Sequence, residues 1–199
     1  MFISFEGIDG SGKSTQARLL TEALGQAALL VREPGGTPAA ERVRELLADG
    51  ALEVDPLAEL LLFCAARADL VQRVIRPALE QGRDVVSDRF ADSTTAYQGG
   101  GRGLGVELAE RLSDAATRGI SPDLTLLLWL DPEQAADRSG GDDRFESAGL
   151  DFQRAVAAAY EQIAAQHPDR VVRVDANSSV EQVHQRVMQE VGARRSKRA

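Results

Sequence analysis

Short apolar segments alternate along the chain with longer segments in which apolar residues recur at helical intervals. The short segments have the length of buried strands, and the longer ones have the spacing of helices that cover a sheet. Because strands separated by helices pair in parallel, this alternation predicts an α/β fold of three layers. The expected sheet has five parallel strands flanked by helices, at residues 2–5, 28–31, 84–87, 124–130 and 171–174.

Capping residues, prolines and glycines predict where several helices begin and end. Thr37 and Asp55 each stand directly before a proline, which is the order of a helix N-cap and the first helical residue. The segment 56–81 contains Pro77, so we expect this helix to be kinked or its regular part to be confined to the earlier turns. Further signals are a capping box at Ser179 and Gln182 and helix stops at Gly25, Gly82 and Gly119.

Length and composition indicate one compact globular domain over residues 1–199. A formal net charge of -8 argues against a surface that holds a polynucleotide, so we expect no nucleic-acid partner. The single cysteine, Cys64, stands in an apolar segment, which favours a buried thiol. No apolar segment could span a bilayer and the first residues lack the basic region of a signal peptide, so we expect a cytoplasmic protein without a membrane partner.

The segment from Gly7 to Ser14 has the pattern of a phosphate-binding loop. It lies between an expected strand and an expected helix, so its backbone N–H groups and the positive end of the helix would face phosphate oxygens. Lys13 would neutralise the β- and γ-phosphates, and the Ser14 hydroxyl would bind Mg²⁺. This context predicts a P-loop NTPase fold whose ATP-binding residues include Gly7, Ile8, Asp9, Gly10, Ser11, Gly12, Lys13, Ser14 and Thr15.

A phosphate loop alone does not identify the phosphoryl acceptor. A regulatory GTPase would need an Asn-Lys-x-Asp segment, but Asn177 is the single asparagine and no such tetrapeptide occurs. Asp88 and Arg89 follow the third expected strand, and ligands of open α/β sheets bind at the carboxyl ends of the strands. There Asp88 could hold Mg²⁺-bound water and Arg89 could grip a second phosphate, although the two could also form a surface ion pair.

Further motifs lie at residues 32–37, 63–67, 88–90, 93–94, 96–103, 122–125 and 175–176. Their order and spacings resemble those of bacterial thymidylate kinases over nearly the whole chain. The resemblance implies transfer of the γ-phosphoryl group of ATP to dTMP, giving dTDP and ADP, with Mg²⁺ as cofactor. It also implies a homodimer, for which the segment from Pro56 onward is the expected interface because it has more apolar positions than one face would bury.

The resemblance also assigns an acceptor site. In this family Phe63 would stack on thymine, Arg67 would reach a base carbonyl, and Tyr97 would lie beside the sugar and favour deoxyribose. From the residues alone, a core aromatic is the favoured interpretation of Phe63, while Arg67 could be a solvated charge and Tyr97 a buried structural tyrosine. The full expected dTMP site is Asp9, Glu33, Pro34, Phe63, Arg67, Arg89, Thr94, Tyr97 and Gln98.

The family also needs an arginine at the transferring phosphoryl group, from the phosphate loop or from a lid. Gly10 leaves this loop without one, so the resemblance assigns the role to Arg144 in a short lid at residues 138–148. The expected catalytic residues are therefore Lys13, Asp88, Arg89 and Arg144. Asp142 and Asp143 precede Arg144 and could pair with it. On the donor side, Arg138 would lie against adenine, and Asp175 and Ala176 would border it, or form an ordinary strand-to-helix turn.

Three segments carry weaker signals. The glycine-rich stretches 98–103 and 139–144 are expected to be mobile loops, and residues 194–199 a solvated basic tail. Two other functions remain open at this point. A kinase for another nucleoside monophosphate or a deoxynucleoside would share the loop and differ at the acceptor site, and a nucleotide-binding switch would lack phosphoryl transfer to a small acceptor.

Overall fold

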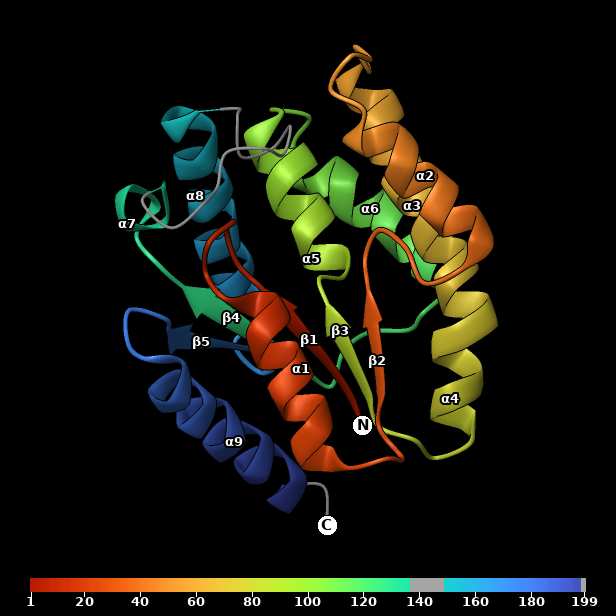
Figure 1. Ribbon diagram of the computed structural model, residues 1–199. Helices are drawn as coiled ribbons and strands as arrows, with labels where there is room; N and C mark the ends of the chain where they lie inside the picture. The colour runs from red at the N-terminus through yellow and green to blue at the C-terminus, as the bar shows by residue number, and fades with distance from the viewer. Residues whose placement is uncertain (137–148, 198–199) are drawn as a thin grey trace.

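The computed structural model describes residues 1–136 and 149–197. A parallel five-stranded sheet with the strand order β2-β3-β1-β4-β5 runs through the molecule (Figure 1). Each expected strand is confirmed to within one residue at either end. The strands are β1 (Phe2–Glu6), β2 (Leu29–Arg32), β3 (Val85–Asp88), β4 (Leu124–Trp129) and β5 (Val171–Asp175).

Helices cover both faces of this sheet and produce the three expected layers. Ile3 of β1 belongs to the same core cluster as Leu20 of α1, whereas the adjacent Phe2 points to the other face and belongs to a cluster with Ile75 of η1. Figure 1 shows α1 and α9 side by side in front of the sheet. The helices are α1 (Lys13–Leu24), α2 (Pro38–Ala48), α3 (Pro56–Leu70), η1 (Val71–Ile75), α4 (Arg76–Glu80), α5 (Ala91–Thr94), η2 (Thr95–Gly101), α6 (Val106–Thr117), α7 (Pro132–Ala136), α8 (Leu150–Gln166) and α9 (Val180–Ser196).

The expected caps form. The Thr37 hydroxyl accepts a hydrogen bond from the Ala40 N–H at 3.1 Å, and the Asp55 carboxylate accepts from the first turn of α3. Ser179 and Gln182 make the reciprocal bonds of a capping box, and Gly25 ends α1 with a positive φ of 87°. The N-caps satisfy N–H groups that have no partner within their helices, and at the end of α1 the Gly25 N–H donates to the Glu22 carbonyl.

Pro77 interrupts the long helical segment as expected. The α-helix ends at Leu70 and a π-helical turn, η1, precedes α4, in which Pro77 is the second residue. Proline has no N–H to donate and its ring crowds the preceding turn, so a wider turn before it relieves the conflict.

The expectation of a mobile loop at residues 98–103 is wrong. Residues 95–101 form η2, in which Gln98 and Gly99 are buried. A Cβ on Gly100 would lie 2.5 Å from the Cβ of Ala159, so these glycines allow α8 to pack closely on η2. The other glycine-rich stretch, 139–144, and the proposed lid at 138–148 lie outside the described residues.

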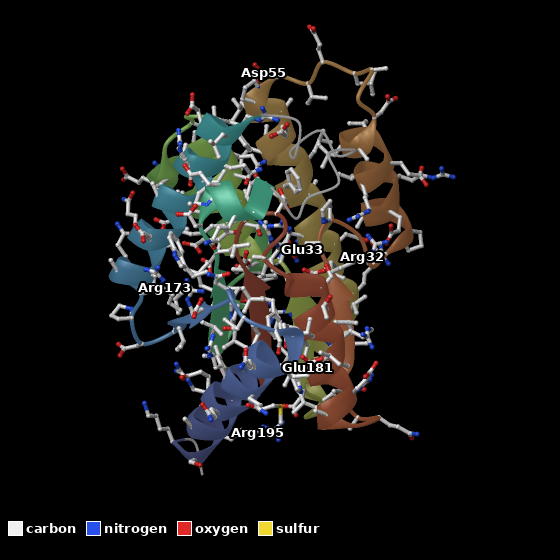
Figure 2. All side chains as sticks on the ribbon, turned by 60° about the vertical axis from the view of Figure 1, so that its left-hand side comes forward. Arg32, Glu33, Asp55, Arg173, Glu181 and Arg195 are labelled. Carbon is white, nitrogen blue, oxygen red and sulfur yellow. The ribbon has the colours of Figure 1, made fainter. Side chains whose placement is uncertain are left out.

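The part of the expected basic tail that the structure describes is mostly exposed to solvent, as expected, but it is helical. Arg194 and Arg195 belong to the last turn of α9, where positive charge suits the helix dipole. Arg195 pairs with Asp84, and Figure 2 shows it at the far end of the molecule from Asp55. No helix in the described ranges is long and apolar enough to cross a membrane.

Candidate active site

The phosphate loop connects β1 to α1 at the carboxyl edge of the sheet. Gly7, Gly10 and Gly12 all have positive φ angles, of 138°, 76° and 88°, which residues with side chains rarely adopt. A Cβ on Gly7 would lie 2.5 Å from the backbone oxygen of Leu128. The glycines therefore give the loop its path, and α1 begins at Lys13 with its N–H groups directed toward the loop.

Lys13 is buried within the phosphate loop. Its Nζ donates to the Ile8 carbonyl at 2.6 Å and to the Ser11 hydroxyl at 3.3 Å. Burial and the positive charge of Arg89 lower the pKa of Lys13 to about 8, although the nearby carboxylates of Asp9 and Asp88 oppose this. A desolvated cation of this kind would interact strongly with a phosphate anion, because no water screens it.

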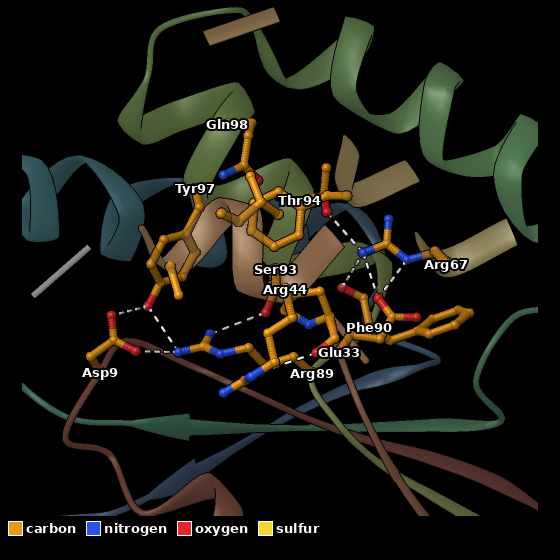
Figure 3. Close-up of a pocket in the computed structure, with 14 residues that line it drawn as sticks. Asp9, Glu33, Arg44, Arg67, Arg89, Phe90, Ser93, Thr94, Tyr97 and Gln98 are labelled. Atoms are coloured by element: carbon orange, nitrogen blue, oxygen red, sulfur yellow. Dashed lines mark hydrogen bonds and ion pairs between the residues drawn. The ribbon is translucent and has the colours of Figure 1, made fainter. Parts of the chain in front are cut away.

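Arg89 joins the phosphate loop to the rest of the site (Figure 3). Its backbone has a φ of 70°, an uncommon value for a non-glycine residue, and is held by an N–H bond to Phe5 and a bond from the Ser87 hydroxyl. Its guanidinium donates to Asp9 and, at 3.1 Å, to the Gly7 carbonyl. Arg89 thus pairs with Asp9 in a partly buried contact across the site, and not with Asp88 in the surface ion pair that was the alternative interpretation.

Asp9 lies between two cations and a phenol. Burial opposes ionisation of Asp9, but Arg89 and Lys13 outweigh it, so the pKa of the carboxyl lies below its usual value. The Tyr97 hydroxyl donates to Asp9 at 2.9 Å and accepts from Arg89 at 3.2 Å. Asp9 therefore remains a carboxylate that orients both side chains, which goes beyond the turn-forming role considered from sequence.

One cavity is lined by every residue that the sequence assigned to the dTMP site. Phe63 is only partly buried there, and Tyr97 borders the same space. Figure 3 shows these side chains converging from several elements. The residues brought together are Asp9, Glu33, Pro34, Phe63, Arg67, Arg89, Thr94, Tyr97 and Gln98, with Arg44, Leu47, Ala48, Phe90 and Ser93 as further lining residues.

Arg67 donates four hydrogen bonds to other residues of the protein, which limits what it can offer a ligand. It donates to Glu33 at 2.7 Å, to Thr94 at 2.8 Å, to the Phe90 carbonyl at 3.2 Å and to Ser113 at 3.3 Å. Because guanidinium has five N–H groups, at most one remains for a ligand. Burial outweighs Arg67 and raises the pKa of Glu33, whose Oε1 has no hydrogen-bond partner in the part of the chain that the structure describes.

Glu6 is a buried carboxyl that the sequence reading missed. It ends β1 and accepts from the Phe90 N–H at 2.8 Å, the Ser93 hydroxyl at 2.5 Å and the Tyr160 hydroxyl at 2.9 Å. Burial and the negative charge of Asp92 raise the pKa of Glu6 to about 7. A charged residue at the carboxyl end of an apolar strand was the available signal. Glu6 fixes the backbone directly after Arg89.

Arg44 is a second missed residue. It lies on α2, lines the cavity and donates to the Pro34 carbonyl at 3.1 Å. From sequence it is one of two arginines on this helix, so nothing distinguished it. With Arg67 and Arg89 it adds positive charge to the cavity wall, which suits an anionic ligand.

The expected donor-side residues lie partly within the described structure. Asp175 ends β5 and pairs with Arg186 at 3.2 Å, and the Ala176 N–H donates to the Trp129 carbonyl at 2.8 Å. Asp175 and Ala176 therefore lie at the carboxyl end of β5, at the same edge of the sheet as the phosphate loop. Arg138 and Arg144 lie outside the described residues.

The expected Mg²⁺ ligands fit a metal that is held largely by substrate. Within residues 1–136 and 149–197, no group of His, Cys, Asp and Glu forms a metal cage. Ser14 is exposed at the start of α1, and Asp88 lies close enough to Lys13 for its charge to oppose the lowering of the lysine's pKa. Mg²⁺ prefers oxygen ligands and keeps water and phosphate oxygens around it, so a hydroxyl and one carboxylate suit it.

The geometry places the chain among the P-loop kinases, because a donor loop with a buried lysine faces an arginine-lined cavity for a second ligand. Comparison with known proteins then narrows the class. The family model described as thymidylate kinase matches residues 5–187. The chain therefore belongs to the thymidylate kinase family.

Individual relatives agree with this assignment. The chain is 45% identical to a thymidylate kinase of Chlorobaculum tepidum, with 97% of each chain covered, and 51% identical to one of Dinoroseobacter shibae, with 88% of each covered. It also resembles the crystal structure of thymidylate kinase from Ehrlichia chaffeensis. That match has a TM-score of 0.80 and 37% identity, and covers 96% of this chain and 98% of the other.

Proposed function

We propose that this enzyme transfers the γ-phosphoryl group of ATP to dTMP, giving dTDP and ADP. The supporting observation is that one cavity gathers all the residues expected to bind dTMP and adjoins the phosphate loop through Arg89. In the proposed reaction a phosphate oxygen of dTMP attacks the γ-phosphorus, and the bond from that phosphorus to the β–γ bridging oxygen breaks. No protein nucleophile takes part.

The donor side would act by positioning and by charge. Loop N–H groups and the start of α1 would hold the β- and γ-phosphates, and Lys13 would exchange its bond to the Ile8 carbonyl for phosphate oxygens. Ser14 and Asp88 would hold Mg²⁺, Asp88 through water. When bound, Mg²⁺ would neutralise negative charge on the phosphate oxygens.

The acceptor side would align the attacking oxygen. Arg89, fixed by Asp9 and Gly7, would hold the dTMP phosphate in line with the donor, and Arg44 would add a second positive charge. Phe63 would stack on thymine, and Tyr97 would crowd a 2′-hydroxyl. Arg144 remains the proposed arginine at the transferring phosphoryl group.

We also propose a homodimer. Leu57 and Leu61 are 43% and 48% exposed and lie four residues apart on one face of α3, with the half-exposed Leu52 and Leu108 as further apolar residues. Burial of this face against a second copy would remove its apolar surface from water. The single sheet, to which both the first and last strands belong, supports one domain over 1–199. The buried thiol of Cys64 accords with the reducing cytoplasm that we propose as its location.

An acceptor panel tests the proposed activity. Purified enzyme is mixed with Mg²⁺-ATP and dTMP, dUMP, UMP, CMP, AMP or GMP, and ADP release is followed. We expect dTMP to give the highest kcat/KM. A clear preference for another acceptor would favour a different nucleoside monophosphate kinase, and ADP release that no acceptor stimulates would favour a nucleotide switch.

A further inference from the structure

A buried carboxylate holds one of the cavity-lining amides. Gln98 is 1% exposed, and its Nε2 donates to Oε1 of Glu59 at 3.0 Å. Glu59 is itself 0% exposed and pairs with Arg102 through two bonds, from Nε to Oε1 at 3.1 Å and from Nη2 to Oε2 at 3.2 Å. The Arg102 guanidinium lies over the Phe152 ring, 4.9 Å from its centroid.

The chemistry of this contact fixes the direction of the amide. A carboxylate paired with arginine can only accept hydrogen bonds, so the Gln98 group facing Glu59 must be the NH₂. The described residues supply no donor to the Gln98 carbonyl oxygen. Because Gln98 lines the cavity, that oxygen is available there as an acceptor (Figure 3).

The position of Glu59 on α3 and the packing of η2 keep the arrangement in place. Glu59 stands one helical turn before Phe63 on α3, so the carboxylate and the ring share the helix face that borders the cavity. On the other side, η2 packs closely against α8 and α6. With Glu59 fully enclosed, water cannot replace it as a partner for Gln98.

We propose that Glu59 is a positioning residue that sets base specificity by fixing Gln98 with its carbonyl toward the base. An acceptor there matches the ring N–H of a pyrimidine-2,4-dione. Cytosine has an acceptor nitrogen at the same ring position, so two acceptors would face each other. The inference rests on dTMP as the proposed acceptor. It also implies that Glu59 does not discriminate between dTMP and dUMP, because both bases carry the same ring N–H.

Glu59→Gln tests the role because its amide can bond Gln98 in either direction. We would measure binding of dTMP, dUMP and dCMP by titration calorimetry without ATP, for the wild type, Glu59→Gln, Gln98→Ala and the double variant. We expect the dTMP-to-dCMP affinity ratio to fall on the order of tenfold to a hundredfold in Glu59→Gln, through weaker dTMP and stronger dCMP binding. In the Gln98→Ala background the same substitution should leave the ratio unchanged.

Two controls separate this role from stability. Glu53→Gln makes the same change at an exposed position, and Val187→Ala loosens the core in α9, away from the cavity. Both should keep the wild-type ratio. The proposal is overturned by an unchanged ratio in Glu59→Gln, by an equal loss for all three nucleotides, or by an effect that persists without Gln98.

The binding assay also distinguishes this inference from the proposed function. If the wild-type enzyme binds dTMP in preference to dCMP but transfers no phosphoryl group to dTMP, the proposed activity is refuted and the proposed role of Glu59 is not. If the wild-type enzyme binds dCMP and dTMP with equal affinity, the proposed role of Glu59 is refuted, whatever reaction the enzyme catalyses.

Discussion

The buried carboxyl of Glu6 gives stability a distinctive dependence on pH. We would replace it by glutamine, whose carbonyl can accept from Phe90 and whose NH₂ can donate to the hydroxyls of Ser93 or Tyr160. The variant keeps the shape and hydrogen bonding of the site but cannot titrate. Its difference from the wild type therefore isolates the ionisation of Glu6.

The magnitude follows from the shift in pKa. Burial and Asp92 raise the pKa of Glu6 from 4.5 to about 7 in the folded protein. The folded state thus keeps a proton that the unfolded chain loses, so the free energy of unfolding of the wild type falls as pH rises from about 4.5 to about 7, and this contribution is constant above that range. One pKa unit is about 1.4 kcal/mol, so Glu6→Gln should gain about 2.5 kcal/mol relative to the wild type between pH 5 and pH 8.

Urea unfolding of both proteins at pH 5, 6, 7 and 8 measures this difference. Glu80→Gln, at an exposed position, serves as the control and should differ from the wild type by a constant amount. A difference between Glu6→Gln and the wild type that stays constant over this range would refute the reasoning, as would one that changes in the opposite direction.

The remaining predictions concern the acceptor site, the lid and the packing of η2. Arg89→Ala should raise the KM for dTMP and lower kcat, with kcat/KM reduced about a hundredfold or more, because Arg89 positions the acceptor phosphate throughout the reaction. Steady-state kinetics at varied dTMP concentration measure this effect, and an unchanged dependence on dTMP would contradict it. Arg144→Ala should lower turnover much more than ATP affinity, and equal losses of both, or none, would argue against its role. Gly100→Ala should cost roughly 1–3 kcal/mol of unfolding free energy in urea because of the clash with Ala159, whereas Gly192→Ala, where a Cβ meets nothing, should stabilise α9 by roughly 0.5–1 kcal/mol.

The strands and the donor loop could be predicted because their causes are local. An apolar run that is buried on both faces can be recognised as a strand without knowing its partners. In the segment from Gly7 to Ser14, the glycines themselves determine the path of the backbone. The acceptor residues were predicted through the family resemblance. Residues alone left Phe63, Arg67 and Tyr97 ambiguous, because burial decides between a core and a ligand role.

What the sequence did not predict depends on distant contacts. Glu6 gains its significance from Phe90 and Tyr160, which lie 84 and 154 residues further along the chain. The glycines at 98–103 suggested mobility, but α8 packs against Gly100 and Gly101, which belong to the helix η2. Arg44 is one of two arginines on α2, and only the folded structure places it at the cavity. Such cases require the tertiary structure.

Label transfer tests the central claim most directly. The enzyme is incubated with Mg²⁺ and ATP labelled in the γ-phosphate, with and without dTMP, and the products are separated. The account predicts that the label moves to dTDP in equal amount to the ADP formed and only when dTMP is present. Label that appears as inorganic phosphate independently of dTMP, or that remains in ATP, would contradict it.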